Sequence, residues 1–321
     1  MRARKCISVF VLRVFAFTAT VLAVSAQPYG YVSNEMGNTV SVVNRTTNKV
    51  SATISVSGGG LTGLAIAPNG SYIYVAEQSK NSVAVISTAT NSVVATIPVG
   101  SAPVHIAIAP NGERAYVANS SSNNVSVIDT STNTVIDTVG VESKPMGIAV
   151  TPDGSRVLVT NFMTGTISVI NTQTNTNWGT WLTLSGPNSI AFSPNGSLAY
   201  VTNQYANSVT VHTLFDGAIV NTITGFSAPN SAAVTPNGKY LYVTNGNSGS
   251  VAAVNLSSME IVAKIPTGLL PTSVAVSSDG STAYVTNGYG FNLSEINIAK
   301  NTLILNVPSV GVYPAAVVLY H

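Results

Sequence analysis

Two residues interrupt a strict internal repeat with side chains that can do acid–base chemistry. Glu77 stands where most copies of the repeat have Asn, and His105 stands where the other copies have Gly, Ser or Ala. If both lie on the same face of the fold, the carboxylate would raise the pKa of the imidazole, and the two would act as an acid–base pair. The alternative is that both are solvated residues at the rim of the molecule.

Uncharged polar residues follow a proline in three successive copies of the repeat and form a second candidate site. Their hydroxyl and amide groups suit a sugar or a peptide backbone, and they suit ordered water equally well. We expect their face of the fold to bind a ligand, because its residues differ from copy to copy. The opposite face, with its nearly identical turns, is expected to be inert. The candidate ligand-binding residues are Asn188, Ser189, Asn203, Asn230, Ser231, Asn245, Thr272, Glu77 and His105.

The other reactive side chains give little support for further chemistry. His105, His212 and His321 lie in different copies without the spacing of metal ligands, and the sequence has no nucleophile motif and no phosphate-binding glycine loop. We therefore expect no metal and no cofactor. His212 replaces Val or Ile in a strand and is expected to be an interior, hydrogen-bonded residue. Trp178 and Trp181 are expected to pack on an edge strand, the alternative being an exposed platform for a partner.

All these residues are placed by a repeat of 42 residues. An Asn-Gly or Asp-Gly turn, in which both residues tolerate a positive φ, marks six copies, with its glycine at Gly70, Gly112, Gly154, Gly196, Gly238 and Gly280. Each copy has four short runs rich in Val, Ile, Thr and Tyr; in the third copy they span 104–109, 115–119, 125–129 and 134–139. Four strands in a period of about 40 residues are typical of a propeller blade. The sequence predicts an all-β, seven-bladed β-propeller of four-stranded blades, and a seven-layered solenoid is the alternative.

The two ends of the repeat region are out of phase with each other. Residues 29–34 match the second strand of a copy, whereas residues 314–319 match the first strand. The C-terminal strand is therefore expected to complete the blade that the N-terminal strands begin. Such closure leaves no open sheet edge between the first and last blades.

The second strand of the copies carries a recurrent motif. It reads Tyr-Val-Ser-Asn at 31–34, Tyr-Val-Ala-Asn at 116–119, and Tyr-Val-Thr-Asn at 200–203, 242–245 and 284–287. This resembles the YVTN-type β-propeller repeat family of secreted and cell-surface proteins, and the resemblance covers residues 29–321. Two copies depart from the motif, with Glu77 in place of Asn and Leu158 in place of Tyr. The resemblance implies the fold, but propellers of this kind serve both as binding surfaces and as supports for enzyme sites.

We expect a binding or interaction module whose ligand, a protein, a peptide or a glycan, docks at the mouth of the central channel. The alternative is a propeller hydrolase of the lactonase type, by analogy with seven-bladed lactonases, in which Glu77 and His105 are the acid–base pair. The scarcity of charged residues expected in the channel argues against the enzyme.

Residues 1–26 have the features of a signal peptide, with a basic start, an apolar run and small residues at its end; an uncleaved membrane anchor is the alternative. Four of the 13 basic residues lie in this segment, which leaves nine against 11 acidic residues in the predicted single domain, residues 27–321. Without a basic stripe, nucleic acid is not an expected partner. No later apolar run is long enough to span a membrane, so we expect a secreted, periplasmic or cell-surface protein.

Overall fold

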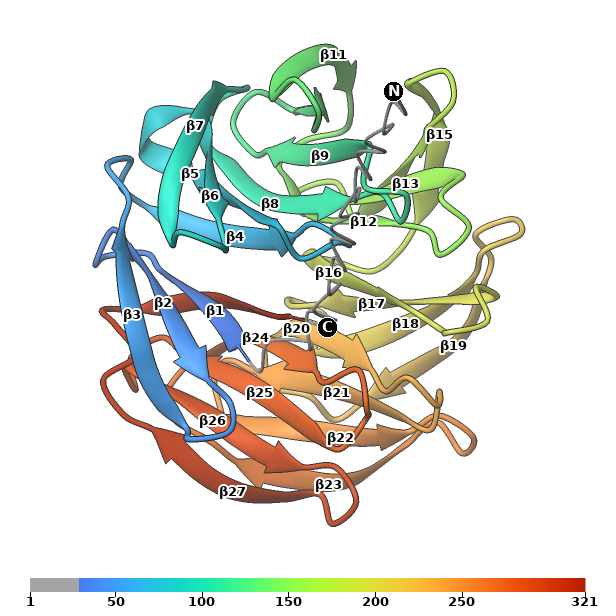
Figure 1. The fold of residues 1–321 in the computed structure, drawn as a ribbon. Helices are drawn as coiled ribbons and strands as arrows, with labels where there is room; N and C mark the ends of the chain where they lie inside the picture. The colour runs from blue at the N-terminus through green and yellow to red at the C-terminus, as the bar shows by residue number, and fades with distance from the viewer. Residues whose placement is uncertain (1–28, 321) are drawn as a thin grey trace, which may run out of the picture.

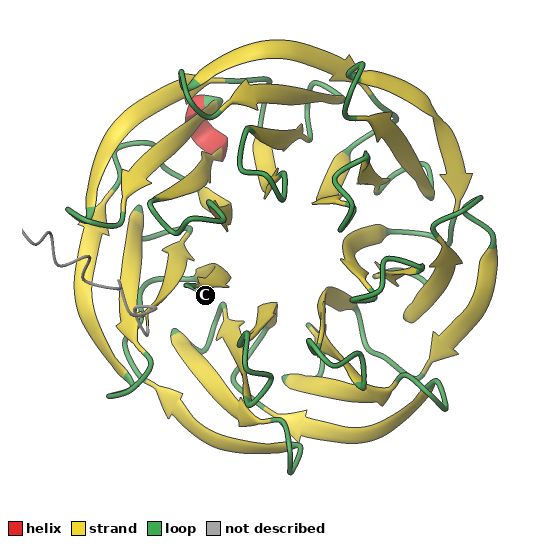
Figure 2. Cartoon of the chain, turned by 45° about the vertical axis from the view of Figure 1, so that its right-hand side comes forward, coloured by secondary structure: helices red, strands yellow, loops and turns green. Residues whose placement is uncertain are grey.

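The computed structural model describes residues 29–320, which form seven antiparallel sheets of four strands each. The sheets are arranged as blades around a central axis (Figure 1). Figure 2 shows the ring viewed along this axis. The predicted seven-bladed propeller is therefore confirmed. The expected signal peptide lies outside the described residues. Within 29–320 the helical structure is the short 3-10 helix η1 (Gln78–Lys80), and no helix there is long and apolar enough to cross a membrane.

The strands of each blade run outward from the channel in chain order, except that blade 1 takes its innermost strand from the C-terminus. Blade 1 contains β28 (Pro314–Leu319), β1 (Tyr29–Asn34), β2 (Thr39–Asn44) and β3 (Lys49–Ser55). Blade 2 contains β4 (Leu61–Ile66), β5 (Tyr72–Glu77), β6 (Ser82–Ser87) and β7 (Ser92–Pro98). Blade 3 contains β8 (Pro103–Ile108), β9 (Arg114–Asn119), β10 (Asn124–Asp129) and β11 (Thr134–Gly140). Blade 4 contains β12 (Pro145–Val150), β13 (Arg156–Asn161), β14 (Thr166–Asn171) and β15 (Thr176–Leu182).

The remaining three blades repeat this plan. Blade 5 contains β16 (Pro187–Phe192), β17 (Leu198–Asn203), β18 (Ser208–Thr213) and β19 (Ile219–Thr224). Blade 6 contains β20 (Pro229–Val234), β21 (Tyr240–Asn245), β22 (Ser250–Asn255) and β23 (Glu260–Pro266). Blade 7 contains β24 (Pro271–Val276), β25 (Thr282–Asn287), β26 (Asn292–Asn297) and β27 (Thr302–Val307).

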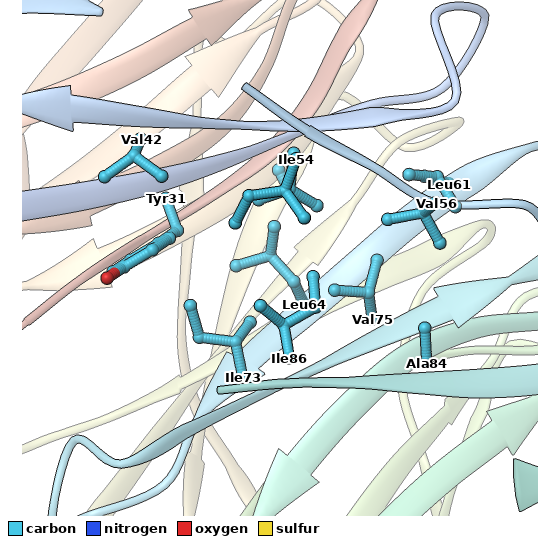
Figure 3. Close-up of a cluster of buried hydrophobic side chains, with 12 residues drawn as sticks. Tyr31, Val42, Ile54, Val56, Leu61, Leu64, Ile73, Val75, Ala84 and Ile86 are labelled. Atoms are coloured by element: carbon cyan, nitrogen blue, oxygen red, sulfur yellow. The ribbon is translucent and has the colours of Figure 1, made fainter. Parts of the chain in front are cut away.

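The hydrophobic core lies between neighbouring blades. Figure 3 shows the junction of blades 1 and 2, where Tyr31 and Val42 of blade 1 lie in one cluster with Ile73 and Ile86 of blade 2. Similar clusters occupy the other junctions. Strands two and three of each blade are buried on both faces, because a blade packs against a neighbour on either side. This explains why they read as continuous runs of Val, Ile, Ala and Tyr.

The turn between the first and second strands differs from the predicted hairpin in one respect. Only the glycine adopts a positive φ, 67° at Gly196, and the preceding Asn does not. Instead, the side-chain oxygen of Asn195 accepts a hydrogen bond from the N–H of Ser197, at 3.1 Å. Asp153 accepts in the same way from Ser155. The residue before the glycine thus acts through its side-chain oxygen. Asn and Asp both have this oxygen, which explains why both residue types occur at this position.

The ring closes as predicted, because β28 pairs with β1 in antiparallel register. Val32 lies opposite Val317, and Gly30 lies opposite Leu319. The strand that comes last in the sequence is therefore the innermost strand of the first blade. This places the start of β28 beside the starts of the other six first strands, at one end of the channel.

Candidate functional site at the channel mouth

The starts of the seven first strands surround a cavity of about 280 Å³ at one end of the channel. Every blade contributes at least one residue to its lining. Of the residues predicted from the sequence, His105, Asn188, Asn230 and Thr272 line this cavity. Its polar groups come from side chains that differ between blades, so the mouth is asymmetric although the fold is a regular repeat.

Several polar side chains at the mouth hold adjacent blades together. Each donates a hydrogen bond to the main chain of the next blade: Thr62 to Pro103 O (3.2 Å), His105 to Met146 O (3.2 Å), Asn230 to Pro271 O (3.3 Å) and Thr272 to Pro314 O (2.9 Å). The Asn230 amide oxygen also accepts from Gln204, at 2.6 Å. Asn230 and Thr272 therefore have their principal donors occupied by the protein, which lowers their capacity to bind a ligand.

Asn188 has more capacity left. Its amide nitrogen lies 3.5 Å from the Asn230 oxygen, at the outer limit of a hydrogen bond. Its own oxygen Oδ1 is buried and has no partner among the described residues. A buried amide with one weak bond is a group that a ligand or a water can satisfy.

His105 is the cavity residue with an unused reactive atom. Its Nδ1 lies 3.2 Å from the carbonyl oxygen of Met146, and because that oxygen can only accept, Nδ1 carries the proton of the neutral ring. Nε2 then carries the lone pair, and within residues 29–320 no side chain or backbone group bonds it. Burial lowers the pKa of His105 below its usual value, and the Met146 hydrogen bond opposes this shift only in part.

The neighbouring blade leaves room for the imidazole. Gly63, at the equivalent position in blade 2, lies against the ring, and a Cβ there would come within 2.5 Å of His105 Cδ2. His105 lies opposite Ala118 of β9. Blades 4 to 7 have Thr at the position of Ala118, and in blade 5 the Thr202 hydroxyl accepts from the N–H of Ser189, at 2.9 Å. Small residues thus surround the imidazole on two sides.

Glu77 is placed away from His105. Its carboxylate is buried, with 1% of the residue exposed, and accepts a hydrogen bond of 2.5 Å from Ser82 of the next strand. It packs on Gly58, where a Cβ would come within 2.0 Å of Glu77 Oε1. In the part of the chain that the structure describes, no hydrogen bond or ion pair joins Glu77 to His105, and Glu77 is not part of the cavity lining. The side chain follows its blade toward β6 instead of turning to the channel.

The other predicted residues lie behind the cavity wall. Asn203 and Asn245 are buried at the ends of their strands; Asn203 donates to Thr210 of β18, and Asn245 accepts from the N–H of Ser227 in the loop before β20. Ser189 and Ser231 also do not belong to the lining. The motif Asn therefore connects the end of the second strand to the third strand or to the loop before the blade.

Among the lining residues that were not predicted, three lie outside the first strands. Glu35 and Gln78 directly follow the last residue of β1 and of β5, and Tyr313 directly precedes β28. Glu35 and Tyr313 lie in loops and Gln78 begins η1, and the repeat does not define the side-chain direction in these segments. The signal in the sequence is the position after the motif, where polar residues stand in blades 1 and 2.

The opposite end of the propeller, which was expected to be inert, carries two larger clefts. One, of about 600 Å³ between blades 4 and 5, is lined by Asp153, Arg156, Asn195 and Phe215 among others. A second, of about 380 Å³, lies between blades 3 and 4. Two of their charged groups are bonded within the protein: Asp153 accepts from Thr151 of its own turn at 2.5 Å, and Arg156 donates to Leu214 O of the next blade at 2.6 Å. The channel mouth is therefore the better candidate for chemistry.

The remaining candidates have structural roles. His212 is fully buried, with Nδ1 3.0 Å from Gly217 O and Nε2 3.0 Å from Thr210 Oγ1, as expected of an interior histidine. Trp181 stacks near this ring at 6.5 Å, whereas Trp178 is 61% exposed, so the two indoles do not form one platform.

Among residues 29–320, no group of three or more His, Cys, Asp or Glu side chains is placed to hold a metal ion.

Comparison with known proteins supports the architecture and adds a family. No curated protein matches the sequence significantly. A putative 6-phosphogluconolactonase from Bacteroides uniformis is similar in structure, with a TM-score of 0.77, 18% identity, and coverage of 92% of this chain and 100% of that chain. A protein of unknown function from Desulfotomaculum acetoxidans gives a TM-score of 0.82, 18% identity, and coverage of 91% and 99%. Hydrazine synthase from Kuenenia stuttgartiensis gives 0.79, 22% identity, and coverage of 85% and 93%. At these identities the similarity concerns the fold.

The sequence itself matches the family described as lactonase, 7-bladed beta-propeller, over residues 13–136 and 180–307. These two stretches make up more than half of the chain and include His105 and most other residues of the channel mouth. The chain belongs to the seven-bladed β-propeller lactonase family.

Proposed function

We propose that this protein hydrolyses a small lactone at the channel mouth, with His105 as the general base. The observation behind the proposal is His105, whose Nδ1 is bonded to Met146 O while its Nε2 remains free and the residue lines the cavity. The chain also belongs to the lactonase family. This revises the expected enzyme alternative in one respect. The base is oriented by a backbone carbonyl, and Glu77 has no part in the reaction.

The reaction follows from the state of the imidazole. Nε2 takes a proton from a water molecule, and the water oxygen attacks the lactone carbonyl carbon. The ring ester bond then breaks, and the imidazolium returns the proton to the leaving alkoxide, so lactone and water give one hydroxy acid. Because burial lowers the pKa of His105, the neutral form needed for the first step is favoured at neutral pH.

The amide groups of Gln78 and Asn188 are the candidates for orienting the substrate. Both line the same cavity as His105. The amide nitrogen of Asn188 makes only a 3.5 Å contact, and its oxygen has no hydrogen-bond partner among the described residues. New hydrogen bonds to a substrate would therefore replace little existing bonding. Hydrogen-bond donors near the carbonyl stabilise the charge that develops on its oxygen.

The proposal is tested by lactone hydrolysis with the variant His105→Gln. The glutamine amide can still donate to Met146 O, but it cannot accept a proton, so we expect kcat to fall by about 10²–10⁴-fold while the melting temperature changes little. Thr62→Val is the matched control, since it removes a similar bond to the next blade, Thr62 to Pro103 O, without removing a base. Hydrolysis by His105→Gln at the wild-type rate would contradict the role of His105, and no hydrolysis of any lactone by the wild type would contradict the activity.

A second candidate function is ligand binding without catalysis at the same mouth, as the YVTN-type repeats favour. The observation behind it is the polar side of the ring formed by Asn188, Asn230 and Thr272. Saturable binding of a glycan or peptide by a protein that hydrolyses no lactone would favour this function over the first.

A further inference from the structure

Among residues 29–320, the lining of the channel mouth has no side chain that is cationic at neutral pH. Its single acidic residue is Glu35, and His105 is its single imidazole; within residues 29–320, no Lys or Arg belongs to the lining. A cavity that binds a phosphate normally supplies Arg, Lys or several backbone N–H groups, because a buried anion needs compensating charge. The residues of this mouth do not supply it.

Glu35 is held at the mouth by its neighbours. Its N–H donates to the carbonyl oxygen of Tyr313, at 2.9 Å, and both residues line the cavity. Tyr313 is in turn packed edge-to-face on Tyr289, with ring centroids 5.3 Å apart. The backbone of Glu35 is thus anchored beside Tyr313, on one side of the cavity that both residues line.

The lysines near this end of the channel are engaged elsewhere. Lys80 Nζ donates to the Ser57 hydroxyl at 3.1 Å, and Lys144 Nζ lies over the Phe162 ring, 5.2 Å from its centroid. Arg114 and Arg156 line the clefts at the opposite end. None of these four cations belongs to the lining of the mouth.

Building on the proposed lactone hydrolysis, we propose that the substrate is an uncharged, hydroxyl-bearing lactone without a phosphate group, and that Glu35 is the residue that selects it. The carboxylate accepts hydrogen bonds from substrate hydroxyls, which are strengthened by its charge. A phosphate group in the same cavity meets like charge and no Lys or Arg, which disfavours its binding. Selection thus combines an attractive group for one substrate with a repulsive one for the other.

The test compares glucono-1,5-lactone with its 6-phosphate as substrates of the full chain at pH 7, after subtraction of spontaneous hydrolysis. We expect the wild type to prefer the neutral lactone in kcat/KM on the order of tenfold or more, since like charges at a binding site are strongly unfavourable. Glu35→Gln should reduce this ratio, and Glu35→Lys should reverse it. Asp137→Lys is the matched control, because it makes the same charge change at an exposed position on the outer strand β11 and should leave the ratio unchanged.

A wild type that prefers the phosphorylated lactone, or a ratio that Glu35→Lys does not move, would overturn the role of Glu35 while leaving lactone hydrolysis intact. If the wild type hydrolyses neither lactone, the proposed activity is wrong, and the charge selection is decided by calorimetric binding of glucitol and glucitol 6-phosphate. Binding of glucitol alone, lost in Glu35→Lys, would support the selection. Tighter binding of the phosphate, or no binding of either compound, would overturn it.

Discussion

His105 joins two blades and at the same time presents a free nitrogen to the channel mouth. In other blades this link comes from a Thr or Asn one residue earlier, where blade 3 has Val104, whose side chain has no donor. The departure of His105 from the repeat was visible in the sequence, and so was its place at the mouth. Its partner was not, because spacing along the chain does not define side-chain direction: Glu77 turns to Ser82, and Met146 O takes the place of the carboxylate.

At the residue scale we predict the pH dependence of lactone hydrolysis. The base must be neutral, so activity is present above the pKa of His105 and is lost as the pH falls through it. Burial lowers this pKa below the ordinary value of 6.5, and the bond to Met146 O raises it by less. The acid limb of kcat/KM should therefore have its midpoint below pH 6.5. Initial rates between pH 4.5 and about 7.5 measure it, and a midpoint above 6.5 would show that another group, or an unburied His105, is the base.

At the scale of elements, the strands were predicted to within about one residue, since the repeat defines each strand several times over. The predicted runs 104–109 and 115–119 correspond to β8 (Pro103–Ile108) and β9 (Arg114–Asn119). The loops were less predictable. Each blade has positions between its strands where the backbone is left-handed, and the residue type at these positions differs from blade to blade. Asn38, Asn81, Asn123 and Asn207 have this conformation in the loop between the second and third strands, and so does Phe291, with φ 52°.

We predict that Phe291→Asn stabilises the protein. A left-handed backbone costs an ordinary residue about 1 kcal/mol or more, and Asn tolerates it. The four equivalent Asn residues also accept a backbone N–H of the following loop, as Asn207 does from Ala228 at 2.8 Å. The free energy of unfolding, measured with urea, should rise by about 1 kcal/mol.

Phe215→Asn provides the control for Phe291→Asn. Phe215 is 91% exposed and does not have a positive φ, so its replacement removes an exposed aromatic ring without relieving the backbone. An equal change in both variants would show that the gain comes from replacing an exposed aromatic ring by a polar side chain. No gain in Phe291→Asn would show that the loop is not strained.

At the scale of the whole molecule, the number of blades and their closure followed from the period of 42 residues and from the phase of the two ends. The cavity did not follow, because it is formed mainly by residues at the starts of the first strands of all seven blades, whose mutual distances only the closed ring defines. Closure also matters for the site itself. Glu35, Tyr313 and Thr272 lie on the two sides of the junction between blade 7 and blade 1, and the Thr272 hydroxyl bonds Pro314 O across it.

The last prediction therefore concerns the closing strand. A chain that ends at Tyr313 lacks β28 and leaves β1 as an open edge beside the channel, which favours aggregation. It also loses the burial of Val317 and Leu319, which are 4% and 3% exposed. At about 1.5–3 kcal/mol per side chain, this is a large part of a stability of about 5–15 kcal/mol. We expect the truncated chain to unfold or aggregate at 25 °C, as judged by circular dichroism and light scattering.

Two further measurements separate loss of the strand from loss of the terminus. A chain that ends at Tyr320 keeps β28 and should melt like the wild type. A synthetic peptide of residues 314–321, added to the shortened chain, should bind beside β1, because the register of β28 uses backbone pairs such as Tyr31 with Val318, and should restore part of the melting transition. If the chain ending at Tyr313 melts like the wild type, six complete blades and three strands hold the ring without β28. The mouth would then not depend on the junction that Thr272 and Pro314 form.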